Sequence, residues 1–197
     1  MILAINGSYR DDGVTDKTVA VLQQALEDSG EQVEVVLLRE YPIEFCLNCR
    51  ECTQRFGVEP GECVQHDGMQ ALIKKIESAD AYILASPTNF GSVTAIFKRF
   101  MERLTVYAYW PWEMNAPQFR KKSVKKKKAI LVSSSAAPGF LARWVFGTQG
   151  QLKMTAKVIG AEVVGTIFTG LIATHRQPNL SESLLNKIRA KALNLVK

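Results

Sequence analysis

The sequence has 197 residues, of which 47% are hydrophobic and 22% are charged, and these values are typical of one soluble globular domain. No apolar run reaches the length of a membrane span, and the N-terminus lacks the pattern of a secretion signal, so we expect a cytoplasmic protein without a membrane partner. The net charge of +6 comes from one basic cluster, Arg120–Lys128, in which seven cations have no acidic residue among them. We expect this cluster to be a solvated loop that can attract phosphates, and we expect no nucleic-acid partner because no recognition motif accompanies it.

The chain opens with an apolar run, Met1–Ile5, which predicts a buried strand, and a polar loop follows it directly. Val19, Leu22 and Leu26 then recur at helical spacing, so the loop leads into the N-terminus of a helix. Free backbone N–H groups and the positive end of the helix dipole favour an anion at such a position. The predicted phosphate-binding residues are Ser8, Arg10, Gly13, Val14 and Thr15.

This first loop does not match other common phosphate-binding patterns. It lacks the Gly-Lys-Ser/Thr ending of a nucleotide triphosphatase loop and the full G-x-G-x-x-G pattern, and it holds no cysteine that could act as a phosphatase nucleophile. Hydroxyl groups, one arginine and a late glycine suit a terminal monophosphate, such as the one on FMN. The alternative is an ordinary strand-to-helix turn with a Ser or Thr cap.

Strands and helices alternate along the rest of the chain. Apolar runs predict strands at 32–38, 80–85, 129–132 and 162–168, and helical periodicity predicts helices near 69–76, 93–104, 141–159 and 184–195. We expect the fourth helix to be interrupted around Gly147 and Gly150, and the last to begin with a capping box of Asn179 and Glu182. The alternation predicts one α/β domain over residues 1–197, a three-layer sandwich whose five-stranded parallel sheet has the order 2-1-3-4-5 with helices on both faces.

A sheet of this order binds ligands where the strand order reverses, between strands 1 and 3. The loop after the third strand, Ser86–Ser92, is therefore expected to face the phosphate loop. Backbone N–H groups near Asn89, Phe90 and Gly91 can bond the polar edge of a flavin ring, and Gly91 permits close approach. The predicted ring-binding residues are Pro87, Thr88, Asn89, Phe90 and Gly91, with Ser133 and Ser134 as a third wall. The alternative is that Pro87 and Gly91 only punctuate a loop.

Together the two loops resemble those of the NAD(P)H-dependent FMN reductases of the flavodoxin-like superfamily. The likeness rests on Asn6–Arg10 with Gly13–Thr15, and on Ser86–Val93 leading into a helix that ends near Glu102 and Arg103. The resemblance implies a flavodoxin-like fold with FMN as cofactor and NAD(P)H as electron donor. It also implies a small acceptor such as a quinone, free flavin or nitro compound, and a homodimer or dimer of dimers with the flavin near the interface.

Four cysteines lie in the long connection between residues 40 and 66. Cys46, Cys49 and Cys52 follow a C-x2-C-x2-C pattern, and Cys63 comes after ten more residues. In a cytosolic chain disulfides are disfavoured, so the thiols are expected to hold a [4Fe–4S] cluster, to hold zinc, or to stay free or redox-active. The region resembles the iron–sulfur flavoproteins, whose cysteines bind a [4Fe–4S] cluster beside FMN. All three interpretations stay open, with free thiols narrowly ahead of a cluster.

The expected function is that of an FMN-dependent oxidoreductase, with an iron–sulfur flavoprotein that carries electrons between protein partners as the alternative. FMN performs the redox chemistry, so we expect no catalytic acid or base, and we place His66 and His175 on the surface. The aromatic run Tyr107–Trp112 is expected to cover a flavin or to pack in a dimer interface, of which we favour the interface. The basic cluster is predicted to receive the 2′-phosphate of NADPH.

Overall fold

The structure is a computed structural model that describes residues 1–137, 146–170 and 179–196. Its centre is a five-stranded parallel sheet of order β2-β1-β3-β6-β7. These strands are β1 (Ile2–Asn6), β2 (Val33–Leu37), β3 (Ala81–Pro87), β6 (Lys127–Ser134) and β7 (Ala161–Thr169). The order confirms the predicted 2-1-3-4-5 arrangement, because β6 and β7 are the fourth and fifth strands of this sheet along the chain.

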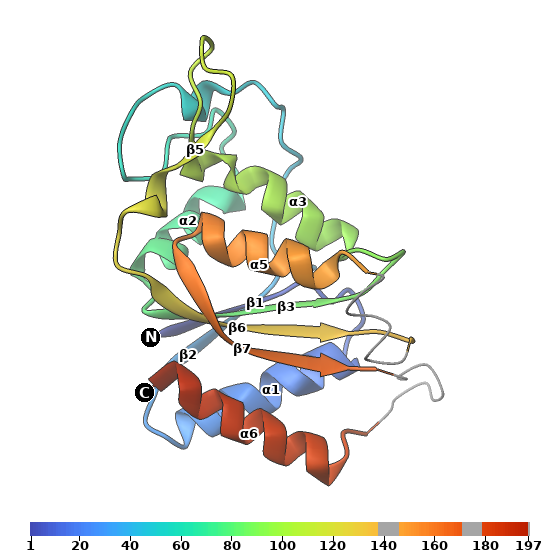
Figure 1. The fold of residues 1–197 in the computed structure, drawn as a ribbon. Coiled ribbons are helices and arrows are strands. Elements are labelled where there is room, and N and C mark those ends of the chain that lie inside the picture. Colours follow the sequence, from blue (N-terminus) through green and yellow to red (C-terminus); the bar gives the residue numbers. More distant parts are fainter. Residues whose placement is uncertain (138–145, 171–178, 197) are drawn as a thin grey trace.

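Helices cover both faces of the sheet and complete a three-layer sandwich (Figure 1). They are α1 (Val14–Glu27), α2 (Gly68–Ser78), α3 (Ala95–Arg103), α5 (Thr148–Val158) and α6 (Glu182–Val196). Successive strand residues point to opposite faces, so Ile2 packs with α1 and α6 while Leu3 packs with α2, α3 and α5. Within the described ranges, none of the helices is both long enough and apolar enough to span a lipid bilayer.

Several element boundaries differ from those expected. The fourth strand of the sheet is longer than predicted, so Ser133 and Ser134 are the last residues of β6 and not loop residues. Helix α5 begins at Thr148, which places Gly147 at its N-cap and Gly150 inside it, and residues 141–145 of the predicted helix lie outside the described residues. The hydroxyl of Ser181 accepts from the Leu184 N–H at 3.3 Å, so Ser181, directly before α6, takes the capping role predicted for Asn179.

A small lobe lies beyond α2 and α3, on the side away from the sheet (Figure 1). It combines the connection that follows β2 with a hairpin of β4 (Ala108–Tyr109) and β5 (Gln118–Phe119), which the sequence did not predict. The lobe also contains the short 3₁₀ helices η1 (Glu51–Thr53), η2 (Leu104–Tyr107) and η3 (Arg120–Lys122).

The start of the basic cluster holds this lobe together and is not solvated as predicted. The Arg120 guanidinium is buried and donates to the carbonyl oxygens of Cys52 and Gly57 at 3.2 and 3.1 Å. Its Nε also donates to the carbonyls of Val106 and Ala108, so one planar group with five donors joins three segments. The Lys121 ammonium, also buried, pairs with the Glu77 carboxylate.

Candidate functional site

The carboxyl ends of β1, β3 and β6 open into a cleft of about 430 Å³. Nine of the predicted cofactor-binding residues line it: Ser8, Arg10, Gly13, Val14, Thr15, Pro87, Thr88, Asn89 and Ser134. Four residues that were not predicted line it as well: Tyr9, Thr94, Ser135 and Ala136. The two loops that the sequence singled out therefore meet at one site, where the strand order reverses.

The N-terminus of α1 forms one end of the cleft. Its N-cap is Gly13, and no side chain in the described part of the protein caps it, so the N–H groups of the first turn have no side-chain acceptor there. The exposed Arg10 side chain folds over Gly13, and no carboxylate of the described residues pairs with its guanidinium. This end of the cleft thus offers backbone donors, a helix dipole and an unneutralised cation to an anion.

Side chains behind the loop fix its shape. Asn6, 1% exposed, accepts from the Ser8 N–H at 2.9 Å and donates to Asp16 at 2.7 Å. Arg39 pairs with Asp16 at 3.0 Å and donates to the Ser8 carbonyl at 3.2 Å. This ion pair neutralises the only acid in the first turn of α1, which would otherwise repel an anion. Sequence reasoning missed Arg39, because it lies beyond β2 and only the fold brings it to the loop.

The loop after β3 ends in a tight two-residue turn. Asn89 and Ser92 exchange both backbone hydrogen bonds, at 2.9 and 3.0 Å, and Phe90 and Gly91 between them have φ of 51° and 76°. The Asn89 N–H is therefore used inside the turn, which corrects its predicted availability to a flavin ring. The N–H groups of Phe90 and Gly91 make no hydrogen bond within the described residues, and both point outward in a turn of this kind. The Phe90 side chain is fully exposed at the tip.

Helices α3 and α5 hold this turn against the first loop. The Thr94 hydroxyl caps α3 and donates to the Gly7 carbonyl at 2.6 Å, while the Gln151 amide oxygen accepts from the Ser92 hydroxyl at 2.8 Å. A Cβ at Gly7 would lie 2.7 Å from the Phe97 side chain, so only glycine allows α3 to pack this closely. The turn is thus rigidly mounted even though its tip is exposed.

Ser133 and Ser134, which were predicted to form a third wall of the site, lie in different environments. The Ser134 hydroxyl reaches the cleft and hydrogen-bonds the Thr15 hydroxyl at 2.9 Å, which ties β6 to the start of α1. Ser133 is 1% exposed and does not line the cleft, because alternate residues of a strand face opposite sides of the sheet. The hydroxyl of Ser133 has no partner among the described residues.

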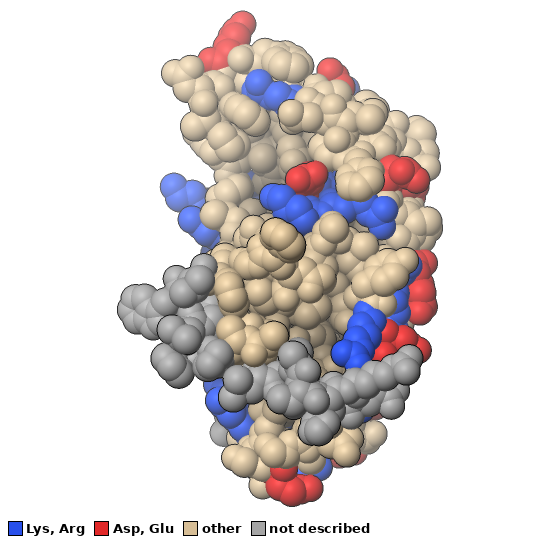
Figure 2. Space-filling view, turned by 90° about the vertical axis from the view of Figure 1, so that its right-hand side faces the viewer, with Lys and Arg blue, Asp and Glu red and all other residues tan. Residues whose placement is uncertain are grey.

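Charged side chains are sparse in the middle of the face that carries the cleft (Figure 2). The described lining contains no Asp, Glu, Lys, His or Cys, and Arg10 and Tyr9 are its only ionisable side chains. His66 is exposed and hydrogen-bonds Gln70 at 3.1 Å, and His175 lies outside the described residues. The part of the lining that the structure describes therefore carries no side chain suited to proton abstraction near neutral pH.

Comparison with known proteins places the chain among flavin reductases. The sequence profile of NADPH-dependent FMN reductases matches residues 1–173, which is most of the chain. The chain belongs to this family. Among solved structures, an FMN-dependent NADH-azoreductase from Bacillus anthracis is 12% identical with a TM-score of 0.69, covering 100% of this chain and 99% of its own. An NAD(P)H:quinone oxidoreductase from Methanothermobacter marburgensis is 16% identical with a TM-score of 0.66, covering 100% and 96%. These two likenesses show the flavodoxin-like fold.

Curated relatives of the FMN reductase family are more similar in sequence. An iron–sulfur flavoprotein from Archaeoglobus fulgidus is 38% identical over 109 residues, which cover 55% of this chain and 47% of that protein. The iron–sulfur flavoprotein MJ1083 from Methanocaldococcus jannaschii is 32% identical over 102 residues, which cover 52% of this chain and 50% of that protein. The chain therefore spans about half the length of the curated relatives that it matches.

The four cysteines are free thiols that lie near one another in the small lobe. Burial, and to a smaller extent the neighbouring thiolates of Cys63, Cys46 and Cys49, raise the pKa of Cys52 to about 11. The Cys46 sulfur accepts from the Asn48 N–H at 3.4 Å, where Asn48 has a φ of 54°. Among the described residues, however, no three Cys, His, Asp or Glu side chains are placed as a ready-made set of metal ligands. The thiols converge without forming a closed site.

Arg103 at the end of α3 joins the cysteine region to the sandwich. Its guanidinium, 1% exposed, pairs with Asp67 at 2.6 Å and donates to the Cys63 sulfur at 3.5 Å. Asp67 caps α2 through the Met69 N–H, as its place before that helix predicts, and accepts from the Glu44 N–H at 2.8 Å. Burial acts to raise the pKa of Asp67, but the hydrogen bonds and charge of Arg103 outweigh it and hold that pKa below its usual range. The sequence placed Arg103 near the end of a helix, but nothing in its pattern linked this residue to the cysteines, which lie far from it along the chain.

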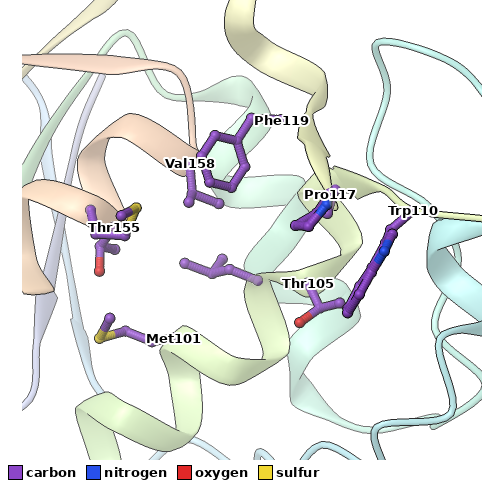
Figure 3. A pocket seen from close by; sticks show the side chains of 10 residues that line it. Met101, Thr105, Trp110, Pro117, Phe119, Thr155 and Val158 are labelled. Atoms are coloured by element: carbon purple, nitrogen blue, oxygen red, sulfur yellow. The ribbon is translucent and has the colours of Figure 1, made fainter. Parts of the chain in front are cut away.

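The aromatic run 107–112 packs mainly against its own chain. Tyr107 is fully buried and donates to Glu77, and the Arg50 guanidinium lies between the rings of Trp110 and Trp112, at 3.8 and 4.5 Å from their centroids. Trp110 also borders an apolar pocket of about 200 Å³ between α3, α5 and the hairpin (Figure 3). No residue of the run lines the cleft, so within one chain it does not cover that site.

The basic cluster lies at the opposite end of the sheet from the cleft. Lys128 pairs in register with Ala81 at the start of β3, whereas Ser134 pairs with Pro87 at its end. At about 3.3 Å per residue, the two ends of β6 are roughly 25 Å apart. The structure therefore corrects the prediction that this cluster binds the 2′-phosphate of an NADPH at the cleft of the same chain.

Proposed function

We propose that the chain binds FMN in the cleft and passes reducing equivalents from NAD(P)H through it to a small acceptor such as a quinone or free flavin. One observation carries this proposal: the N-terminus of α1 and Arg10, which has no carboxylate partner among the described residues, line the same cleft as Pro87, Thr88 and Asn89 of the loop after β3. Membership in the NADPH-dependent FMN reductase family supports the same ligand.

The phosphate of FMN fits the α1 end of the cleft. The N–H groups of Val14 and Thr15 and the Arg10 guanidinium would donate to its oxygens, and charge-assisted bonds of this kind are among the strongest in proteins. The Ser8 hydroxyl now donates to the Arg10 carbonyl at 3.1 Å and can turn to a phosphate instead.

The flavin ring fits the other end of the cleft. The outward N–H groups of Phe90 and Gly91 would donate to a polar edge of the ring, and Pro87 would contact its apolar face. A bulky residue with positive φ is strained, and strain of this kind concentrates at ligand-binding positions.

FMN supplies hydride and electron transfer when bound, and the residues of this chain bind and orient it. Pockets of 300–1,000 Å³ are typical for cofactors, and the cleft of about 430 Å³ falls within that range.

The proposed activity is tested by steady-state oxidation of NADH and NADPH with FMN-loaded protein and a soluble quinone. We expect turnover well above that of the same concentration of free FMN. The Arg10→Ala variant should need more added FMN to reach the same rate, whereas Arg189→Ala, an exposed arginine on α6, should not. Protein that retains FMN but oxidises neither nucleotide faster than free FMN would contradict the proposal.

A second candidate function is that of an iron–sulfur flavoprotein that carries electrons between protein partners. The proximity of the other three thiols to Cys52 favours it, and several curated relatives bear that name. Four thiolates are the donor set that a [4Fe–4S] cluster uses, and Cys46, Cys49, Cys52 and Cys63 would supply them.

Anaerobic preparation separates the two functions. Iron and inorganic sulfide in about fourfold amounts per chain, both lost in Cys49→Ser, with NAD(P)H oxidation no faster than with free FMN, would favour the carrier function. If the protein is free of iron, has four titratable thiols and keeps full turnover in Cys49→Ser, only the reductase function remains supported.

We also propose that the chain forms a homodimer or a dimer of dimers. The exposed apolar side chains of Phe90 and Tyr9 stand beside the cleft, and exposed apolar groups of this size are typical of interfaces. Light scattering on the purified protein should give twice or four times the chain mass of 21.9 kDa, and a mass of one chain would contradict this.

A further inference from the structure

A second cleft, of about 650 Å³, lies where α5 ends and β6 begins, at the end of the sheet opposite to the flavin cleft. Three aromatic and four cationic side chains line it: Phe56, Tyr109, Phe119, Arg120, Lys122, Lys126 and Lys157. We call it the aromatic–cationic groove. The described residues that line it include no Asp or Glu.

The aromatic side of the groove is preformed. The rings of Phe56 and Tyr109 meet edge to face with centroids 5.2 Å apart, and Phe56 is 83% exposed. Phe119 comes from the facing strand of the hairpin and also borders the small apolar pocket of Figure 3. Exposed rings held in fixed positions are the surfaces on which planar bases stack.

The cationic side of the groove is not neutralised within the described chain. Lys122 and Lys157 make no ion pair there, and the Lys126 ammonium gives one of its three donors to the Lys121 carbonyl at 2.5 Å. The Lys157 ammonium stands 5.6 Å from the centre of the Phe119 ring. The buried Arg120 guanidinium, bonded only to carbonyl oxygens, adds positive charge beneath the groove.

We propose that the aromatic–cationic groove binds a nucleotide, with the base against Phe56 and Tyr109 and a phosphate on Lys122, Lys126 and Lys157. Rings without cations would suit any apolar ligand, and cations without rings would suit any anion, so the combination selects a planar group that carries a phosphate. The groove volume of about 650 Å³ can hold one nucleotide but is too small for a folded nucleic acid. The same chemistry occurs in a free mononucleotide and in the adenylate half of a dinucleotide.

This site is separate from the proposed flavin cleft. The two lie at opposite ends of β6 and share no lining residue. The groove also borders the segment between Cys52 and Cys63, because Phe56, Gly57 and Val58 line it. A nucleotide bound there would contact the cysteine lobe directly.

Isothermal titration of the purified chain with AMP, NAD⁺, adenosine and inorganic phosphate tests the proposal. We expect AMP or NAD⁺ to bind at least about tenfold more tightly than adenosine or phosphate alone, since both halves of the ligand contribute. Tighter binding of AMP assigns the groove to free nucleotides, and tighter binding of NAD⁺ assigns it to dinucleotides. Phosphate binding as tight as that of AMP would overturn the proposal.

Matched variants locate the binding. The double variant Lys122→Ala, Lys157→Ala and the single variant Phe56→Ala should each weaken AMP binding by about tenfold or more. Lys153→Ala, one turn earlier on α5, and Phe45→Ala, another exposed ring, lie outside the groove and should leave it unchanged. AMP binding that is lost in Arg10→Ala but kept in the groove variants would place the nucleotide in the other cleft and overturn the inference.

Discussion

Asp67 and Arg103 form the most deeply buried ion pair of the described structure, with side chains 10% and 1% exposed. The carboxylate also caps α2 and accepts the Glu44 N–H, so one residue joins the cysteine connection to two helices. Removing one partner of a buried pair leaves the other charge without compensation, which is more damaging than the loss of an exposed pair. This residue therefore governs how the small lobe is attached.

The variant Asp67→Asn should lower the free energy of unfolding by about 3–5 kcal/mol at neutral pH. The pKa of Asp67 is depressed in the folded protein, so its contribution is fully present above the unfolded value of about 3.9 and is lost as the pH falls through the folded value. Urea unfolding at several pH values should show wild type and variant converging below about pH 4. A difference that stays constant across this range would contradict the role of the charge.

A second residue-scale prediction concerns Gly7. A Cβ at this position would lie 2.7 Å from Phe97 atoms, so Gly7→Ala should destabilise the protein by about 1–3 kcal/mol and move α3 away from the first loop. The matched control is Gly150→Ala inside α5, where nothing lies within 4 Å of the added Cβ and helix propensity should add about 0.5–1 kcal/mol. Thermal unfolding of both variants measures the contrast, and equal shifts would count against the close approach of α3.

At the scale of elements, the turn after β3 has a strained backbone conformation that lowers stability and leaves one edge of the turn exposed for binding. Phe90 has a φ of 51°, which a bulky side chain adopts only under strain, while its ring gains no burial within the described chain. Four hydrogen bonds to α5 and β6 hold the loop in place: Thr88 to Ser134, Thr148 to Thr88, Gly147 to Gly91 and Ser92 to Gln151. The strain is maintained by the surrounding elements, as expected of a functional turn.

The variant Phe90→Gly should relieve this strain and raise the free energy of unfolding by about 1 kcal/mol. If the Phe90 ring contributes to flavin binding, the same variant should bind FMN more weakly. Chemical denaturation and FMN titration of one preparation measure both effects. A loss of stability would show that the positive φ carries no strain.

The cysteine lobe and the cleft are separate elements, joined by α3. This helix begins with Thr94 at the cleft and ends with Arg103 at Cys63, so the two regions are about 13 Å apart along its axis. We therefore predict that Cys49→Ser leaves the FMN dissociation constant within about twofold of wild type, because Cys49 is not among the described residues that line the cleft. Loss of FMN from this variant would show that the lobe supports the cleft.

At the scale of the whole molecule, much of the sandwich could be predicted from sequence periodicity. Buried strands such as Ile2–Asn6 read as unbroken apolar runs, and α3 repeats its apolar positions cleanly. The meeting of the first loop with the loop after β3 followed from the strand order alone. Nine of twelve predicted binding residues line one cleft for this reason.

Contacts between distant segments could not be predicted in this way. Arg39, Arg103 and Arg120 each bond groups that are far from them in the sequence, and no local pattern indicates these contacts. Only the start of the basic cluster departs from the solvated loop expected of a charge run, because the Arg120 guanidinium satisfies four carbonyl groups and can therefore be buried. The prediction that Ser133 is a loop residue was wrong because pairing with β3 and β7 extends β6 through Ser134. The local sequence does not show where this pairing ends.

The measurement that tests the central claim most directly is the affinity of the chain for FMN, followed by quenching of flavin fluorescence. We predict tight, stoichiometric binding by wild type and a loss of about 1–3 kcal/mol in Arg10→Ala and in Ser8→Ala, with no change in Arg189→Ala. Equal affinity in all four proteins, or no binding by wild type, would contradict a flavin site at the N-terminus of α1.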